Sequence, residues 1–288
     1  LCQFLKIYTN FRNHDICYID SYENMSVYLK WLKAKDSKEE KDYWQRYLLD
    51  CPITEDFHAF HLRKKPKTSE QSECECRSYE FSESQQEEIQ LFVKENGMTS
   101  GCLFASIWGI ILNLYADVDD VVFGVTVSGR AGKEEAIQKV VGVLMNTLPF
   151  RLKIEMTDQV IKILKNAQHD FNTMQSYDST PLTEIQSYAG VPADKALFNT
   201  LIVVENYPVE MIKGAALEID SIEGYSHTGY DILVAVNYFH KKTVNFIYNP
   251  AKLKGVFIER LVEMFIQCLE WVLYNSSREL KELDDFLL

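Results

Sequence analysis

A polar pair interrupts one of the most apolar extended segments of the chain. Residues 142–154 are mostly apolar, and Asn146 and Thr147 lie in the middle of them. A buried amide that finds no hydrogen-bond partner costs about 1–3 kcal/mol of folding free energy. Asn146 can therefore be a structural amide at a turn or strand end, since Asn near Pro is common in turns. Alternatively, it lines a cavity in which a substrate supplies the partner.

Two further polar positions accompany predicted strands. Ser128 and Gly129 directly follow the apolar segment Asp120–Val127 and predict a loop, which is most simply a tight turn. Arg151 lies in the apolar segment that contains Asn146. An arginine at such a position either faces solvent or is held in a buried ion pair.

The remaining cysteine, histidine and glycine motifs do not predict a metal or nucleotide site. Cys74 and Cys76 are separated by one residue, whereas a zinc knuckle has a longer spacer and a second ligand pair. His58, His61 and Cys51 would reach one metal ion only if a loop folded around it. The chain contains neither Gly-x-x-x-x-Gly-Lys nor Gly-x-Gly-x-x-Gly, which argues against nucleotide binding.

Composition and charge exclude two classes of partner. The 288 residues are 47% hydrophobic and 25% charged, which is typical of a soluble globular protein. The net charge is −12 and the strongest basic run is Arg63–Lys67, so nucleic-acid binding is disfavoured. The longest apolar stretch, Phe104–Leu114, is shorter than the roughly 20 residues that span a bilayer. We therefore expect neither nucleic acid nor membrane as a partner.

The cysteines and the first residues predict a location. Seven cysteines without regular spacing, and no basic and apolar leader at the start, predict free thiols in the reducing cytoplasm. Because Leu1 is not a start methionine, we expect the sequence to begin inside a larger polypeptide.

The elements that must position the polar residues follow from periodicity. Residues 1–50 predict amphipathic helices, with Ser37 and Glu40 as a capping box. Residues 51–72 lack periodicity and predict a crossing linker. The predicted strands are Cys74–Phe81, Asp120–Val127, Val141–Ile154, Leu197–Glu205, Ala215–Ile222, Asp231–Tyr238 and Thr243–Tyr248. One predicted helix is capped by Ser82 or Ser84 and ends at about Glu95. The other predicted helices are Thr99–Tyr115, Asp158–Met174 and Lys252–Tyr274. This mixture predicts an α/β sandwich with helices on a mixed sheet.

In this order the segments resemble the condensation domain of nonribosomal peptide synthetases. The matching segments are Val27–Leu32, Tyr43–Leu48, Phe123–Arg130, Val141–Arg151, Tyr177–Ile185 and Leu197–Pro208. The resemblance covers nearly the whole chain. It implies the fold of the CoA-dependent acyltransferases, typified by chloramphenicol acetyltransferase, with two lobes around a cleft. Residues 1–50 would then be the helical tail of the N-terminal lobe, 51–72 the crossing linker and 73–288 the C-terminal lobe.

The chain departs from the family's pattern in two places. The arginine, asparagine and proline that usually precede the Leu-Phe pair are replaced by Ala193–Ala196, so no role is assigned to that arginine. The His-His-x-x-x-Asp-Gly motif would lie just before Leu1, and His14 stands alone and does not match it. We therefore expect no catalytic residue in this chain and no activity from the chain alone.

The resemblance implies a transferase that joins a donor acyl thioester to an acceptor aminoacyl thioester through an amide bond. Phosphopantetheine arms of upstream and downstream peptidyl carrier domains would deliver both substrates, with no tightly bound cofactor. The adjacent adenylation domain and the N-terminal lobe are further expected partners.

The same resemblance gives the polar residues expected roles. Asn146 and Thr147 would line a substrate tunnel, and Ser128 and Gly129 would shape its floor, where a glycine lets the pantetheine arm approach the backbone. Arg151 would pair with the acid of the absent motif and brace the two lobes. The Asn-Thr-Leu-Pro sequence favours condensation over epimerisation. The alternatives are a non-catalytic lobe that docks carrier proteins, a heterocyclisation domain and another acyltransferase of the superfamily.

Overall fold

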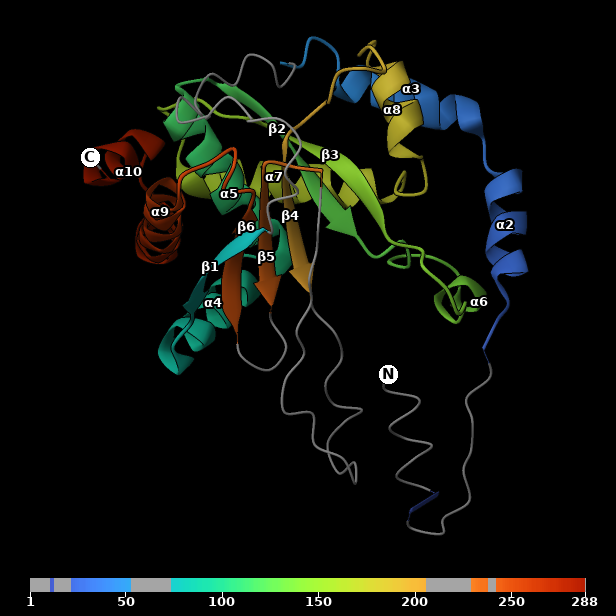
Figure 1. Ribbon diagram of the computed structural model, residues 1–288, viewed down its shortest axis with the longest axis horizontal. Helices are drawn as coiled ribbons and strands as arrows, with labels where there is room; N and C mark the ends of the chain where they lie inside the picture. Colours follow the sequence, from blue (N-terminus) through green and yellow to red (C-terminus); the bar gives the residue numbers. More distant parts are fainter. Residues whose placement is uncertain (1–10, 13–21, 53–73, 206–228, 238–241, 288) are drawn as a thin grey trace.

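The computed structural model describes residues 11–12, 22–52, 74–205, 229–237 and 242–287 (Figure 1). The predicted crossing linker lies almost entirely outside these residues. The predicted strand Ala215–Ile222 also lies outside them, as do residues 1–10 and 13–21 of the region predicted to be helical.

A six-stranded mixed sheet forms the centre of the described structure (Figure 1). Its strands are β1 (Glu75–Glu80), β2 (Asp120–Val127), β3 (Asn146–Lys153), β4 (Thr200–Glu205), β5 (Ile232–Asn237) and β6 (Thr243–Tyr248). Their order across the sheet is β1-β6-β5-β4-β2-β3. β2, β4 and β5 run parallel, and the remaining pairs are antiparallel. The carboxyl ends of β2 and β4 therefore meet at one edge of the sheet.

Long helices cover one face of this sheet. They are α4 (Glu83–Glu95), α5 (Ser100–Ala116), α7 (Val160–Gln175) and α9 (Gly255–Asn275). α5 is buried over nearly its whole length because almost all its residues are apolar. Trp108 of α5 and Phe265 of α9 both contact Phe246 of β6, and Phe171 of α7 contacts Phe150 of β3. The predicted α/β class, with helices packed on a mixed sheet, is confirmed.

Two helices precede the sheet and differ in how they are held. α3 (Ser37–Tyr47) places Trp44 in the main core, with no exposed surface. α2 (Met25–Ala34) has no buried residue and packs on the short helix α6 (Glu135–Gln138). α2 and α6 lie at the edge of the molecule opposite α9 and α10 (Figure 1). They form a satellite cluster centred on Ile137, Val140 and Leu144.

Several predicted boundaries hold and others are wrong. β2 and β6 have the predicted bounds, and Ser82 caps α4 in a capping box with Gln85. The capping box predicted at Ser37 is wrong, since the Asp36 side chain accepts the Lys38 N–H and Ser37 is already helical. β3 begins only at Asn146, so residues 141–145 are not part of the predicted strand.

Three short helices lie outside the main layers. α8 (Leu182–Tyr188) follows Pro181 and begins within the segment Tyr177–Ile185 that resembles the family. α6 and α10 (Leu280–Leu287) had no counterpart among the predicted elements. No single helix of the described residues has the length and apolar composition to cross a membrane. α4 and α5 meet those criteria only as a pair, and they are bent by 101°.

Candidate functional site

A cavity of about 330 Å³ opens beside Ser128, where β2 and β4 end. We call it the Ser128 cavity. α5 and its cap supply Thr99, Ser100, Gly101 and Ala105, β2 and its loop supply Val125, Thr126, Val127 and Ser128, α7 supplies Phe171 and Gln175, and β4 supplies Ile202 and Val204. The cavity thus lies at the carboxyl ends of parallel strands, which is where open α/β sheets commonly bind ligands. Of the predicted tunnel residues, Ser128 lines it, whereas Gly129, Asn146 and Thr147 are not among its described lining residues.

The turn after β2 requires a glycine for packing reasons. Gly129 has a φ of +70°, and a Cβ added there would overlap the carbonyl oxygen of Leu144. The Ser128 side chain accepts the Arg130 N–H, and Arg130 Nη2 donates to the carbonyls of Val140 and Gly142 at 3.0 and 2.8 Å. The close approach that Gly129 permits is therefore to the chain's own backbone. This geometry favours the tight-turn alternative for Gly129.

The Asn146 side chain is fully used by backbone groups. Its Nδ2 donates to the carbonyls of Asp178 and Thr180 at 2.9 and 2.8 Å, and its Oδ1 accepts the Thr147 N–H at 2.9 Å. Both donors therefore join the start of β3 to the turn after α7, and the acceptor bonds the next residue of β3. This bonding favours the structural alternative for Asn146, and a contact between its amide and a substrate would require these hydrogen bonds to open.

Arg151 is buried and binds an acid of this chain. Its side chain is 6% exposed, and Nε and Nη2 donate to the Asp120 carboxylate at 2.9 and 2.6 Å. Nη1 donates to the carbonyls of Tyr47 and Leu49 at 2.9 and 2.8 Å. The hydrogen bonds to Asp120 raise the pKa of the guanidinium.

The contacts of Arg151 exclude one of its two alternatives. The solvent-facing alternative is wrong because the side chain is buried between β2 and the end of α3. Its acid within this chain is Asp120, on the neighbouring strand β2, and a pairing with an acid of the absent motif stays a prediction. Tyr47 adds to this junction, because its hydroxyl accepts the Arg151 N–H at 2.9 Å, and burial raises the pKa of Tyr47. Arg151 thus fastens α3 to the sheet.

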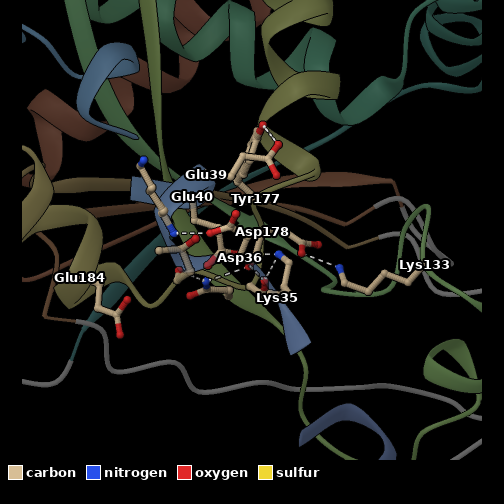
Figure 2. Close-up of polar contacts among 12 residues, drawn as sticks. Lys35, Asp36, Glu39, Glu40, Lys133, Tyr177, Asp178 and Glu184 are labelled. Atoms are coloured by element: carbon tan, nitrogen blue, oxygen red, sulfur yellow. Dashed lines mark hydrogen bonds and ion pairs between the residues drawn. The ribbon is translucent and has the colours of Figure 1, made fainter. Parts of the chain in front are cut away.

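A second polar junction, absent from the sequence predictions, lies where α2 meets α3 (Figure 2). Lys133, from the loop before α6, forms an ion pair with Asp178, and both side chains are almost fully buried. Lys35 contacts Glu40 and donates to Ser179 Oγ at 2.6 Å.

Aromatic contacts complete this junction. The amino groups of Lys35 and Lys133 lie 4.8 and 5.4 Å from the centre of the Trp31 ring. Tyr177 stacks on Tyr43 of α3 and donates to Glu39 at 3.0 Å. Only the proximity of these residues in the fold reveals the cluster, because they come from three separate stretches of the sequence.

The described residues contain few candidates for acid–base chemistry or metal binding. Of the six histidines, the structure describes His169, which is exposed and lines a separate depression beside Arg151. His14, His58 and His61 lie outside the described residues. Within the described part of the chain, no three His, Cys, Asp or Glu side chains gather as metal ligands. The full sequence contains no adjacent pair of histidines.

The chain belongs to the condensation domain family. The family model matches residues 1–286. Tyrocidine synthase 3 of Brevibacillus parabrevis is 30% identical over 90% of this chain, and surfactin synthase subunit 2 of Bacillus subtilis is 31% identical over 85%. The matched parts make up 4% and 7% of those proteins. The homologues are thus nonribosomal peptide synthetases many times longer than this chain.

Solved condensation domains share the fold. The first condensation domain of the calcium-dependent antibiotic synthetase, in complex with a substrate analogue, superposes with a TM-score of 0.72 at 14% identity. That match covers 96% of this chain and 61% of the solved one. The condensation domain of monacolin K polyketide synthase gives a TM-score of 0.77 at 11% identity and covers 97% of this chain and 68% of that one. The fold is therefore that of the CoA-dependent acyltransferases.

Proposed function

We propose that this chain is part of the site that joins a donor acyl thioester to an acceptor aminoacyl thioester. The match to the condensation family over residues 1–286 carries the proposal. In the reaction, the acceptor amine attacks the thioester carbonyl, the carbon–sulfur bond breaks, and the thiol of the donor arm leaves with a proton. The products are an amide on the acceptor arm and a free donor thiol.

The proposed substrates arrive on phosphopantetheine arms of carrier domains. Upstream and downstream peptidyl carriers, an adenylation domain and an N-terminal lobe are accordingly the proposed partners. Two tethered substrates held in near-attack geometry gain much of their rate from orientation. The Ser128 cavity supports this because four of its lining residues, Ala105, Val125, Val127 and Ile202, are no more than 5% exposed. Apolar walls of this kind limit the access of water to a thioester.

The chain alone is proposed to be inactive. Its sequence has no adjacent histidine pair to act as the base that the family uses. The test compares the 288-residue chain with the longer polypeptide that contains it, each supplied with separately loaded donor and acceptor carriers. We expect the longer polypeptide to form an amide-linked product on the acceptor carrier and the isolated chain to form none. Product from the isolated chain would overturn the proposed inactivity, and no product from the longer protein would overturn the proposed function.

The absence of a histidine pair also favours a second candidate, a non-catalytic lobe that docks carrier proteins. This candidate predicts that the longer polypeptide binds loaded carriers and forms no product. A heterocyclisation domain would instead release one more molecule of water per product than amide formation does. The mass of the acceptor-bound product therefore separates all three functions in one experiment.

A further inference from the structure

The exposed lining of the Ser128 cavity is about half polar, and its apolar part includes buried side chains of β2, β4 and α5. Val125 of β2 lies in register with Ile202 of β4, and Val127 and Ala105 enclose the same space. All four side chains are at most 5% exposed. None of the twelve described lining residues carries an ionisable group. A charged side chain placed here would lose its hydration and find no counter-charge among them.

The described residues at the cavity mouth are polar. Thr99 and Ser128 are exposed, and Ser100 and Gln175 are partly exposed. Hydroxyl and amide groups at the mouth can bond the carbonyl and N–H groups of an acyl unit, while its side chain contacts the buried apolar side chains. The volume of about 330 Å³ lies at the lower end of the roughly 300–1,000 Å³ of small-molecule sites. It has room for one side chain and not for a peptide.

We propose that the Ser128 cavity receives the uncharged side chain of one thioester-bound acyl unit, of the branched aliphatic or aromatic class. This assignment rests on the proposed function, because a thioester substrate is what brings such a side chain to the site. The cavity then sets which substrates the domain accepts, separately from the chemistry of amide formation.

Gly101 is the lining residue at which the size of the cavity can best be changed. It lies in the first turn of α5 and lines the cavity, and a Cβ added there would meet no atom within 4 Å. A larger residue at this position therefore occupies free space without displacing the core. Leucine is also a better helix former than glycine, so Gly101→Leu is expected to fold. Gly229→Leu is a matched control, since Gly229 is exposed, has equal room for a Cβ and does not line the cavity.

The first test measures binding to the chain by calorimetry. The probes are stable amide analogues in which pantetheine carries a leucyl, phenylalanyl, glycyl, aspartyl or lysyl group. We expect the leucyl and phenylalanyl probes to bind about tenfold or more tightly than the aspartyl and lysyl probes. Gly101→Leu should weaken phenylalanyl binding about tenfold and leave glycyl binding unchanged, and Gly229→Leu should change neither. Equal affinities for all probes, no binding of any probe, or no effect of Gly101→Leu would overturn the assignment.

A second test separates this inference from the proposed function. In the longer polypeptide, the same two variants are assayed with carriers loaded with phenylalanyl or glycyl units. Selective loss of phenylalanyl product in Gly101→Leu supports the assignment. Unchanged products in that variant overturn the assignment and leave the proposed function in place. If the unaltered protein forms no product from any carrier, the proposed function fails, and the binding data alone decide the cavity's preference.

Discussion

Two ion pairs lie near α3, and they are built differently. The Arg151–Asp120 pair is completed by the carbonyls of Tyr47 and Leu49, which accept from Nη1. The Lys133–Asp178 pair is more deeply buried, yet Asp178 Oδ2 has no hydrogen-bond partner among the described residues. Every guanidinium nitrogen of the first junction has an acceptor, whereas the second junction leaves a carboxylate oxygen unsatisfied.

The difference between these ion pairs indicates that burial alone does not make an ion pair stabilising. The free-energy cost of desolvating two charges is offset only where every remaining donor and acceptor also finds a partner. Arg151 nearly meets this condition, and because it donates to two carbonyls at the end of α3 it is tied to the position of that helix. The Lys133 pair meets it only in part. The two junctions should therefore respond differently when both members of a pair are removed together.

The largest effect is expected at Arg151. Arg151→Met leaves Asp120 without its cation and two carbonyls without donors, so we expect a loss of about 3–5 kcal/mol in the free energy of unfolding. Urea denaturation followed by circular dichroism measures it. Arg77→Met is the control, because Arg77 forms an exposed pair with Glu259, and it should leave the transition unchanged. A loss at Arg151 no larger than in this control would contradict the assigned role.

Double variants that remove both members of an ion pair distinguish the two junctions. Lys133→Met alone strands the Asp178 carboxylate in the interior and should destabilise the protein by about 3 kcal/mol. Adding Asp178→Leu removes the stranded charge and should restore most of that loss. Arg151→Met with Asp120→Leu should restore little, because the Tyr47 and Leu49 carbonyls still lack donors. Equal recovery in both double variants would show that the two junctions are energetically alike.

A smaller and local effect is expected in α2. Trp31 packs in the satellite cluster and lies near both lysines, each such contact contributing about 0.5–2 kcal/mol. Trp31→Ala should speed amide hydrogen exchange in α2 about tenfold while α5 keeps its protection. Leu29→Ala, at an exposed position of the same helix, should change neither helix. Equal loss of protection in α5 would show that α2 is not an independent unit.

The smallest effect concerns a half-buried acid. Burial raises the pKa of Asp170, so its charged form is disfavoured in the folded state. That penalty exists at neutral pH and is relieved as the pH falls through the raised pKa. Asp170→Asn should therefore raise Tm slightly at about pH 7, and the gain should vanish below the unfolded value of about 3.9. Asp194→Asn, an exposed control, should leave Tm unchanged at both pH values. If the Tm gain of Asp170→Asn persists at acid pH, the raised pKa of Asp170 is not its cause.

Local patterns predicted much of the fold. The apolar run of α5, the strands β2 and β6, and the cap at Ser82 were all readable because nearby residues determine them. β3 was predicted too long, because residues 141–145 are apolar like a strand but have no partner strand. Strand pairing is a non-local property, so the segment's own composition did not reveal its end. α6 has four residues, too few to show a helical period.

The candidate site was predicted less well for a similar reason. Asn146 was identified as an amide that needs partners, but those partners lie 32 and 34 residues away in the turn after α7. Arg151 was predicted either to face solvent or to form a buried ion pair, and its acid within this chain lies on the neighbouring strand. The sequence predicted neither the ion pair of Lys133 with Asp178 nor a role for Gly101, because the environments of these residues depend on how α2, α5 and α7 pack.

The position of β1 affects how this protein folds during synthesis and where it can be truncated. β1, at residues 75–80, is an outer strand of the sheet, and its neighbour is β6, at residues 243–248. A nascent chain therefore cannot pair β1 with its neighbour until β6 has also left the ribosome, and such long-range pairing slows folding. A recombinant piece that ends anywhere between these strands would expose the backbone edge of β1 and invite aggregation.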